Sequence, residues 1–208
     1  MIRVITIERE YGSGGGAIAE QVAARLGWKL WDQLLTQEIA RRMDCECQAV
    51  AKHEEREDPV YYRLLKSFMR GSHEGSLSAP RLKMLDADCV REVAKKLVPE
   101  ISREGNSVIV GRGSAYYLCS RPDTFHVFIY APFHERVRRL QETGKSESEA
   151  EELADTVDRD RADFIKRYFK VDWPARNCFH LMVNSAVGNE VAVDIILDAV
   201  ARYGKQKT

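Results

Sequence analysis

The 208-residue sequence has no excess of charge of either sign, because 32 lysine and arginine residues balance 32 aspartate and glutamate residues. A dedicated nucleic-acid or membrane-surface binder would carry a basic surplus, so neither partner is expected. The apolar runs are too short to span a bilayer, and the opening "MIRVITIERE" lacks the long apolar stretch of a signal peptide. Any anion site should therefore be local, built from a few clustered arginines.

Cysteine is scarce and irregularly spaced. The five cysteines are odd in number and scattered, which favours reduced thiols and a cytoplasmic protein. Cys45 and Cys47 form a C-x-C pair with no second pair and no histidine cluster nearby, so no metal site is expected there. A chain of this length suits one domain, or one domain with a modest insertion.

Strand-like and helix-like segments alternate along the chain. Apolar, β-branched stretches predict five strands, at residues 2–7, "WKLWD", "SVIVG", "FHVFIYA" and "FHLMVNS". Apolar spacings of three and four predict helices at residues 17–26, 81–103 and 189–203, and over "FHERVRRLQETG" and "SESEAEELADTVDRDRADFIKRYF". Gly27 should end the first helix, and Pro99 should kink the second or end it early. The pattern predicts an α/β fold in three layers, with a five-stranded, mostly parallel sheet and helices on both faces.

A glycine cluster, "EYGSGGGAIA", connects the first strand to the first helix. Converging backbone N–H groups at a helix N-terminus attract phosphate, and glycine lets the chain curl closely around the anion. The standard pattern G-x-x-x-x-G-K-[ST] is absent, since its lysine place falls near Gly15 and its hydroxyl place near Ala17. The cluster is either a phosphate loop without its usual cation or a tight strand-to-helix turn.

A second polar cluster lies on the long helix near residue 160. At 100° per residue, Arg159, Asp160, Asp163 and Arg167 fall within roughly a 100° arc, opposite an apolar stripe. They could be an i,i+4 ion-pair ladder on a solvated face. The preceding helix carries three arginines, however, and the two helices follow the fourth strand across the short link "ETGKSES". We therefore expect these two helices to form a lid over the ligand-binding edge of the sheet. A capping box of Ser146 and Glu149 should begin the second of them.

Four segments carry a further signal in combination: "VITIEREYGSGGGAIAEQVAARLGWKLWD", "VIVGRGSAYYL", "FIYAPFHERVRRL" and "TVDRDRADFIKRYF" followed by "NS". Together they resemble the cytidylate kinase-like branch of the nucleoside monophosphate kinases. The similarity runs from about residue 2 to 200, and only the combination of motifs is specific. It implies a single kinase-like domain over residues 1–208, with a helical acceptor-side insertion at about 33–104 and a helical lid hairpin at about 132–168.

The resemblance also implies a role for each segment. The phosphates of ATP, with Mg²⁺, would be wrapped by Gly12, Ser13, Gly14, Gly15 and Gly16. Catalytic arginines near the transferring phosphoryl group would be Arg136, Arg139 and Arg159. The acceptor would be bound by Asp32, Arg112, Asp160, Asp163 and Arg167. Arginine suits such a site because its planar fork binds phosphate oxygens in pairs.

The sequence departs from the kinase pattern in three places. The loop has no lysine, Ala17 stands where a hydroxyl usually helps to hold Mg²⁺, and Gly113 stands where cytidylate kinases carry an aspartate. Arg9, at the start of the loop, is the best candidate for the missing cation.

Two functions follow from these observations. The first is a phosphotransferase that moves the γ-phosphate of ATP to a nucleoside monophosphate, of the CMP or dCMP kind, or to a related small phosphate acceptor. The second is a nucleotide-binding protein without useful kinase activity, a sensor or assembly module. The lid arginines favour the first, and the loop without lysine favours the second.

Overall fold

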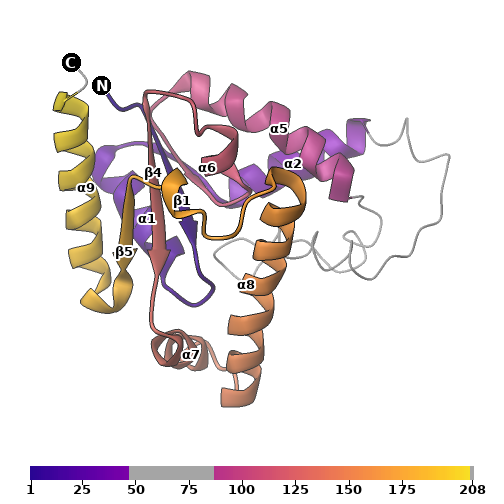
Figure 1. The fold of residues 1–208 in the computed structure, drawn as a ribbon, viewed down its shortest axis with the longest axis vertical. Helices are drawn as coiled ribbons and strands as arrows, with labels where there is room; N and C mark the ends of the chain where they lie inside the picture. Colours follow the sequence, from indigo (N-terminus) through magenta and orange to yellow (C-terminus); the bar gives the residue numbers. More distant parts are fainter. Residues whose placement is uncertain (47–86, 207–208) are drawn as a thin grey trace.

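The computed structural model describes residues 1–46 and 87–206 of the chain. Its centre is a five-stranded sheet in the order β2-β3-β1-β4-β5, in which every pairing is parallel (Figure 1). The strands are β1 Val4–Arg9, β2 Lys29–Trp31, β3 Ser107–Val110, β4 Thr124–Tyr130 and β5 Leu181–Asn184. Each of the five predicted strand segments therefore forms a strand of one sheet.

Helices cover both faces of the sheet, which confirms the predicted three-layer α/β architecture. One face packs on α1 Gly15–Leu26 and α9 Asn189–Gln206, where Ile5 and Ile7 of β1 meet Ile18 of α1. The other face packs on α2 Gln33–Glu46, α5 Ala87–Glu104, α6 Ser114–Tyr117 and the C-terminal half of α8 Glu147–Phe169. The remaining elements are α7 Phe133–Gln141, η2 Arg176–Cys178 and η3 Ser185–Val187.

The central strand leads directly into the glycine cluster. All six residues of β1 are buried, because β3 and β4 flank the strand and helices cover both faces. The chain leaves β1 at Arg9 and enters α1 at Gly15, and Gly14 is the N-cap in the left-handed region, at φ 76°. Gly27 ends α1 at φ 65°, as predicted. The N-terminus and the C-terminal end of α9 lie at the opposite end of the molecule from this turn (Figure 1).

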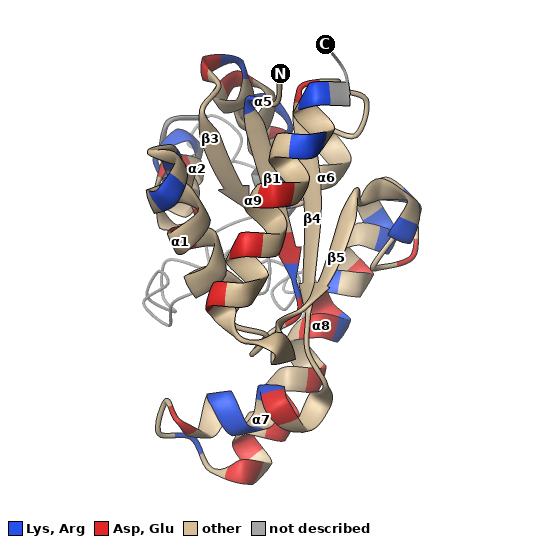
Figure 2. Cartoon of the chain, turned by 90° about the vertical axis from the view of Figure 1, so that its left-hand side faces the viewer, with Lys and Arg blue, Asp and Glu red and all other residues tan. Residues whose placement is uncertain are grey.

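Helix α7 and the N-terminal half of α8 pack on each other and project beyond the sheet at the carboxyl end of β4 (Figures 1 and 2). A small apolar cluster joins them, in which Val137 and Leu140 meet Ala150, Ala154 and Val157. The Ser146 side chain caps α8 by accepting a hydrogen bond from the Glu149 N–H at 3.3 Å, so the predicted capping box is present in this half. The surface of this hairpin carries charges of both signs (Figure 2).

Two parts of the sequence interpretation need comment. Helix α5 continues through Pro99 to Glu104 and does not end early, because buried Val98 and Ile101 on either side of Pro99 outweigh one lost backbone hydrogen bond. Of the predicted insertion at 33–104, the structure describes α2 and α5. Residues 47–86, with Cys47 and the loop-like "GSHEGSLSAP", lie outside the described residues. Within the described ranges, no helix combines the length and apolarity needed to cross a bilayer.

Candidate functional site

The glycine loop presents free backbone donors at the start of α1. Gly12 and Gly14 adopt left-handed conformations, with φ of 78° and 76°, which L-residues with side chains rarely adopt. No acceptor among the described residues takes a hydrogen bond from the backbone N–H of Gly14, Gly15 or Gly16. These donors lie at the positive end of the helix dipole, so the loop has the geometry of an anion site.

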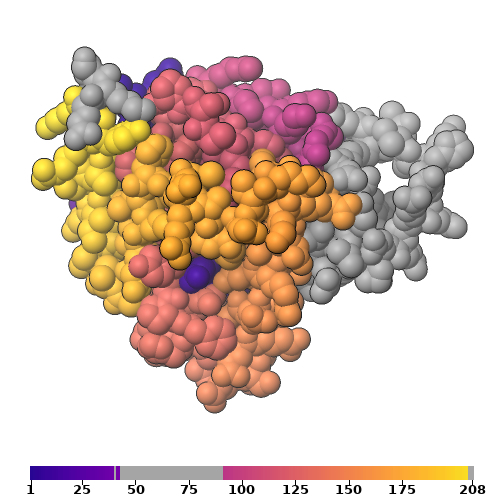
Figure 3. Space-filling model, viewed as in Figure 1, coloured from indigo at the N-terminus to yellow at the C-terminus, as the bar shows by residue number. Residues whose placement is uncertain are grey.

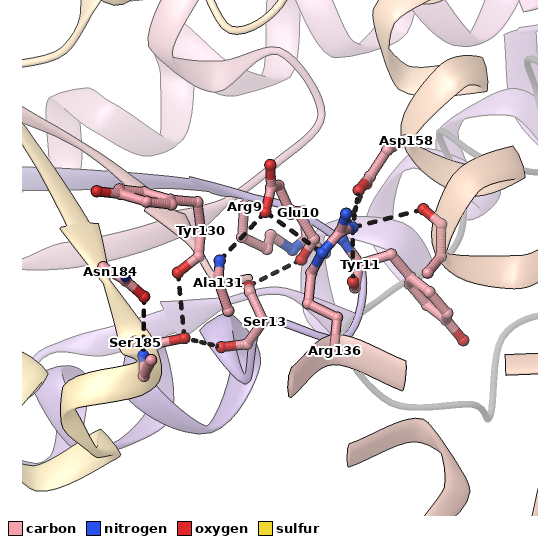
Figure 4. Close-up of polar contacts among 12 residues, drawn as sticks. Arg9, Glu10, Tyr11, Ser13, Tyr130, Ala131, Arg136, Asp158, Asn184 and Ser185 are labelled. Carbon is pink, nitrogen blue, oxygen red and sulfur yellow. Dashed lines mark hydrogen bonds and ion pairs between the residues drawn. The ribbon is translucent and has the colours of Figure 1, made fainter. Parts of the chain in front are cut away.

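Three arginines from the hairpin hold the carbonyl oxygens of alternate loop residues. Arg161 donates to the Arg9 carbonyl at 2.7 Å and Arg136 to the Tyr11 carbonyl at 3.3 Å (Figure 4 shows the Arg136 end of this network). Arg139 donates to the Ser13 carbonyl at 2.7 Å. Because carbonyls and N–H groups point in different directions along the loop, these contacts fix its shape and leave the glycine N–H groups available.

Arg139 is the guanidinium beside the start of α1. A Cβ placed on Gly14 would lie 3.3 Å from Arg139 Nη1 and 3.2 Å from Asn189 Oδ1. The Arg139 guanidinium also donates to the hydroxyl and the carbonyl of Ser185, both at 2.9 Å. Ser185 is fully buried after β5 and donates to the Ser13 carbonyl at 2.6 Å (Figure 4). The ends of β1 and β5 and the helix α7 therefore meet at the loop.

Arg136 is held by carboxylates on both sides. Its Nη1 contacts Asp158, and its Nε lies 3.4 Å from Glu10 Oε2 (Figure 4). Asp158 also accepts from the Tyr11 N–H at 2.8 Å and from Arg161 at 3.1 Å. Burial raises the pKa of Asp158, while Arg161, the Tyr11 N–H and Arg136 lower it. This one carboxylate thus connects the loop to both helices of the hairpin.

A pocket lies next to the loop, on the α8 side of the sheet. It encloses about 340 Å³ of non-atom space, part of it open to solvent, and is lined by Glu8, Arg9, Arg112, Gly113, Arg161, Phe164, Ile165 and Trp173. In Figure 3 a small part of the N-terminal segment, in indigo, is visible between the hairpin and the chain that follows α8. Three guanidinium groups and one carboxylate around so small a space make it suited to an anionic ligand.

The electrostatics of the pocket follow from burial. Burial lowers the pKa of Arg112 to about 9, with Asp32 acting in the opposite direction and Arg9 in the same direction. Burial likewise lowers the pKa of Arg161 to about 10, with a further decrease from Arg9 and an increase from Asp158. Arg9 therefore disfavours the charge of both Arg112 and Arg161, and an anion bound among them would relieve that repulsion.

The guanidinium of Arg9 belongs to this pocket and not to the start of α1, although its stem lies there. A Cβ on Gly111 would clash with Arg9 Nη1, so the guanidinium reaches the end of β3, and only glycine leaves room for it there. A Cβ on Gly15 would lie 2.7 Å from Arg9 Cβ, so the stem of Arg9 passes directly beneath the loop. Arg139, rather than Arg9, is thus the guanidinium next to the place of the missing loop lysine.

The structure brings together some of the predicted acceptor residues. Arg112 and Asp32 are both buried, Arg112 donates to the Thr36 hydroxyl, and Asp32 acts electrostatically on Arg112. Arg112 lies in the left-handed region, at φ 58°, between Gly111 and Gly113. These residues stand at the carboxyl ends of β2 and β3, where the parallel sheet predicts a ligand site.

The predicted arc on α8 does not face the pocket as a unit. Arg159, Asp163 and Arg167 are exposed, and Arg159 pairs with Asp155 at 2.9 Å. Asp160 is buried with 7% of its surface exposed. A helical wheel places these four residues on one side, but the buried stripe is wide enough to include Asp160 and leaves the other three in solvent.

Three functional candidates were missed at the sequence level: Glu8, Asp158 and Arg161. A signal for Arg161 exists, because it falls between Val157 and Phe164 at spacings of four and three, in register with the apolar stripe. Glu8 likewise occupies a position in a strand that is otherwise buried and mostly apolar. A charged residue in an apolar register is the pattern that would have identified both.

The residues around the loop do not form a metal site of their own. Among the described residues, no group of three or more histidine, cysteine, aspartate or glutamate side chains could hold a metal ion. Glu10 and Asp158, the carboxylates nearest the loop, are engaged with Arg136, Arg161 and backbone N–H groups.

Comparisons with known proteins agree with this geometry. A shikimate kinase from Acinetobacter baumannii, solved in complex with shikimate, has a TM-score of 0.53 at 15% identity, over 97% of this chain and 94% of that one. An uncharacterized protein from Eubacterium ventriosum has a TM-score of 0.68 at 20% identity, over 97% of this chain and 99% of that one. The parallel sheet with a glycine loop before α1 is the fold of the P-loop kinases.

The chain belongs to the cytidylate kinase-like family, whose model matches residues 4–187. This confirms the resemblance seen in the sequence. Cytidylate kinases from Methanosarcina mazei and Methanosarcina acetivorans are 30% and 27% identical over 102 and 103 residues, which is 48% of this chain in each case. The chain spans 56% and 57% of the length of these curated relatives.

Proposed function

We propose that this protein is an ATP-dependent phosphotransferase whose acceptor is a nucleoside monophosphate of the CMP or dCMP kind, or a related small phosphate acceptor. The observation that supports this most strongly is the set of free glycine N–H groups at the start of α1, next to Arg139 and beside a pocket with three buried arginines. The ATP phosphates would occupy Gly12 to Gly16, and the acceptor the adjoining pocket. The similarity to two cytidylate kinases adds support for the acceptor class.

Phosphoryl transfer depends on positioning and charge neutralisation, which these residues can supply. Arg139 would stabilise charge on the transferring phosphoryl group, since its guanidinium lies closest to the helix start. Arg9, Arg112 and Arg161 would hold the acceptor phosphate, with Asp32 orienting Arg112. Mg²⁺, as in other kinases, would neutralise charge on the phosphates of ATP and would arrive bound to them.

The direct test is an ADP-release assay with Mg²⁺-ATP and a panel of nucleoside monophosphates. We expect ADP release that depends on the acceptor and is fastest with CMP or dCMP. The product should be identified by mass spectrometry, which separates transfer from ATP hydrolysis. ADP release that is the same with and without every acceptor would contradict the proposal.

The loop assignment has a matched control within one helix. Gly14 and Gly27 flank α1, both in the left-handed region, but a Cβ on Gly27 meets nothing within 4 Å. Gly14→Ala should lower ATP affinity at least tenfold in calorimetry, because it disturbs the N–H cradle and crowds Arg139. Gly27→Ala introduces a similar backbone strain away from the loop and should leave affinity unchanged. Equal effects of the two substitutions would remove the loop from the site.

One structural feature favours the alternative of a nucleotide-binding protein without useful kinase activity. Arg136, Arg139 and Arg161 all donate to loop carbonyls, and the loop has no lysine of its own. If these arginines do not leave the carbonyls, they can shape a binding loop but cannot follow a moving phosphoryl group. ATP binding in calorimetry combined with no acceptor-dependent ADP release would establish this second function.

A further inference from the structure

The pocket contains the carboxylate of Glu8, which would repel an anionic ligand and therefore needs another explanation. Glu8 ends up at the carboxyl end of β1 with only 5% of its surface exposed. One side of its carboxylate is bonded by the backbone N–H of Gly113. No hydrogen-bond donor of the described residues reaches the other oxygen, Oε1, which is fully buried.

Neutralising the charge of the neighbouring arginines would not by itself require Oε1 to lack a hydrogen bond. Arg9, Arg112 and Arg161 all act on Glu8 electrostatically, yet none of them bonds to Oε1. Buried polar atoms in proteins almost always have a hydrogen-bond partner, so this oxygen is an acceptor available to a donor group on a bound ligand. The indole N–H of Trp173, which also lines the pocket, is likewise buried with no hydrogen-bond partner in the described part of the chain. The pocket is therefore equipped for a ligand with donors and acceptors, in addition to an anionic group.

Glu8 also lies close to the proposed phosphate loop. It is followed by Arg9, whose stem lies directly beneath Gly15 at the start of α1. Glu8 lines the same pocket as Arg9, Arg112 and Arg161, where the acceptor is proposed to bind, so a group bound in that pocket would lie beside its carboxylate. Phosphate acceptors need no base, because their oxygens are already deprotonated at neutral pH. A hydroxyl acceptor must lose a proton, and a carboxylate at this place could accept it.

We propose that this site also phosphorylates hydroxyl groups, with a small hydroxylated molecule such as a nucleoside as acceptor and Glu8 as the catalytic base. This rests on the proposed transfer from ATP. The hydroxyl oxygen forms a bond to the γ-phosphorus, and the bond from that phosphorus to the bridging β-γ oxygen breaks. ADP leaves, and the hydroxyl proton passes to Glu8 and then to water. Burial raises the pKa of Glu8, against the opposing effect of the three arginines, and so strengthens it as a base.

Cytidine and CMP form a matched pair for the test, since they share base and sugar and differ only in the 5′-hydroxyl or 5′-phosphate. ADP release should be measured with each, and the product identified by ³¹P NMR. We expect the wild-type protein to convert cytidine to CMP. Glu8→Gln keeps the size of the side chain and removes the base, so it should lower kcat for cytidine by about a hundredfold or more, and for CMP by less than tenfold.

Two further variants complete the design. Glu20→Gln makes the same chemical change at an exposed glutamate of α1 and should alter neither rate. Glu8→Asp retains a carboxylate and should keep measurable turnover of cytidine, and it serves as the test variant if the melting temperature shows that Glu8→Gln does not fold. Transfer to CMP with none to cytidine, or equal losses for both acceptors in Glu8→Gln, would overturn the base assignment alone. No transfer to either acceptor would overturn the proposed function as well.

Discussion

Helix α8 carries two arginine–aspartate pairs with similar geometry and very different surroundings. Arg159 and Asp155 lie 2.9 Å apart with 60% and 67% of their side chains exposed. Arg161 and Asp158 lie 3.1 Å apart with 11% and 13% exposed. The exposed pair is screened by water and bonds to no other residue among those the structure describes, whereas the buried pair also holds the Arg9 carbonyl and the Tyr11 N–H of the loop.

The contrast shows that burial, and not distance, decides what an ion pair does. An exposed pair contributes about 0–1 kcal/mol to stability. Removing one member of a buried pair leaves an uncompensated charge in a poorly solvated place, which costs far more. The buried pair of Arg161 and Asp158, here called the inner pair, can therefore control both the loop and the pocket. The exposed pair of Arg159 and Asp155, the outer pair, can be lost without consequence for either. Four substitutions or conditions test this contrast, in order of expected effect.

The largest effect should come from Arg161→Met, which keeps the apolar stem and removes the guanidinium. Asp158 then remains buried with a single guanidinium partner, so we expect the free energy of unfolding to fall by about 3–5 kcal/mol in urea titrations. Acceptor affinity should fall as well, because a pocket arginine is lost. A decrease below about 1 kcal/mol would mean that the inner pair resembles the outer one.

Acid should have the next largest effect on stability, because it protonates the buried His126, whose ring stacks on that of His180. Burial, together with His180, lowers the pKa of His126 from its usual 6.5 to about 4. The unfolded chain therefore takes up the proton first as pH falls below 6.5. Stability should be unaffected above pH 7 and should decline between 6.5 and 4, by about 2 kcal/mol at pH 5. Urea titrations at pH 7.5 and 5.0 measure this decline.

The His126→Asn variant provides the comparison for the acid effect. An asparagine can still bond to the Thr6 hydroxyl, which lies 2.7 Å from His126 Nδ1, but it does not titrate. The loss of stability between the two pH values should be smaller in this variant than in the wild-type protein. The same loss in both would assign the acid sensitivity to other groups.

A moderate effect is expected from Arg139→Ala on α7, where an inner and an outer arginine are adjacent. Arg139 contacts Ser13 and Ser185, whereas Arg138 pairs with Glu135 and Glu142 on the exposed side. Loss of a charge-assisted contact near the phosphates should weaken ATP binding by about 1.5–3 kcal/mol in calorimetry, about ten- to a hundredfold. The control Arg138→Ala should bind ATP normally, and if it does not, the distinction between the two sides of α7 is wrong.

The smallest effect should come from Arg159→Ala. Its exposed pair with Asp155 should contribute less than about 0.5 kcal/mol to stability. In this conformation the side chain is far more exposed than Arg161, so acceptor affinity should change less than twofold in calorimetry. A tenfold loss of affinity would instead place Arg159 in the site, where the resemblance to cytidylate kinases implies a catalytic arginine.

Much of the fold could be predicted because its signals are local. The strand at residues 4–9, the glycine cluster, the Gly27 cap and the Ser146 cap each depend on a few neighbouring residues. Asp32 and Arg112 could also be placed at one edge, because parallel strands bring their carboxyl ends together. The role of each of these site residues stays a prediction.

Which polar residues of α8 face inward could not be predicted from the sequence, and the reason is physical. Periodicity gives the angle of a residue around a helix but not the width of the buried arc, which depends on what packs there. Here β1 and the loop press on α8, so that Asp158, Asp160 and Arg161 turn inward beside Val157 and Phe164. The partners of Arg136 and Arg139 depend on the same packing, so they likewise cannot be predicted from any short stretch of sequence.

The carbonyl contacts of the glycine loop have a consequence for synthesis of the chain. The arginines that hold the loop follow it by 125 to 152 residues, and Ser185 follows Ser13 by 172. A ribosome releases β1, the loop and α1 long before α7 and α8 exist. The loop should therefore take its final form late, after the last strand has joined the sheet. An N-terminal fragment could form the strand and helix, but it would lack the contacts that shape the turn between them.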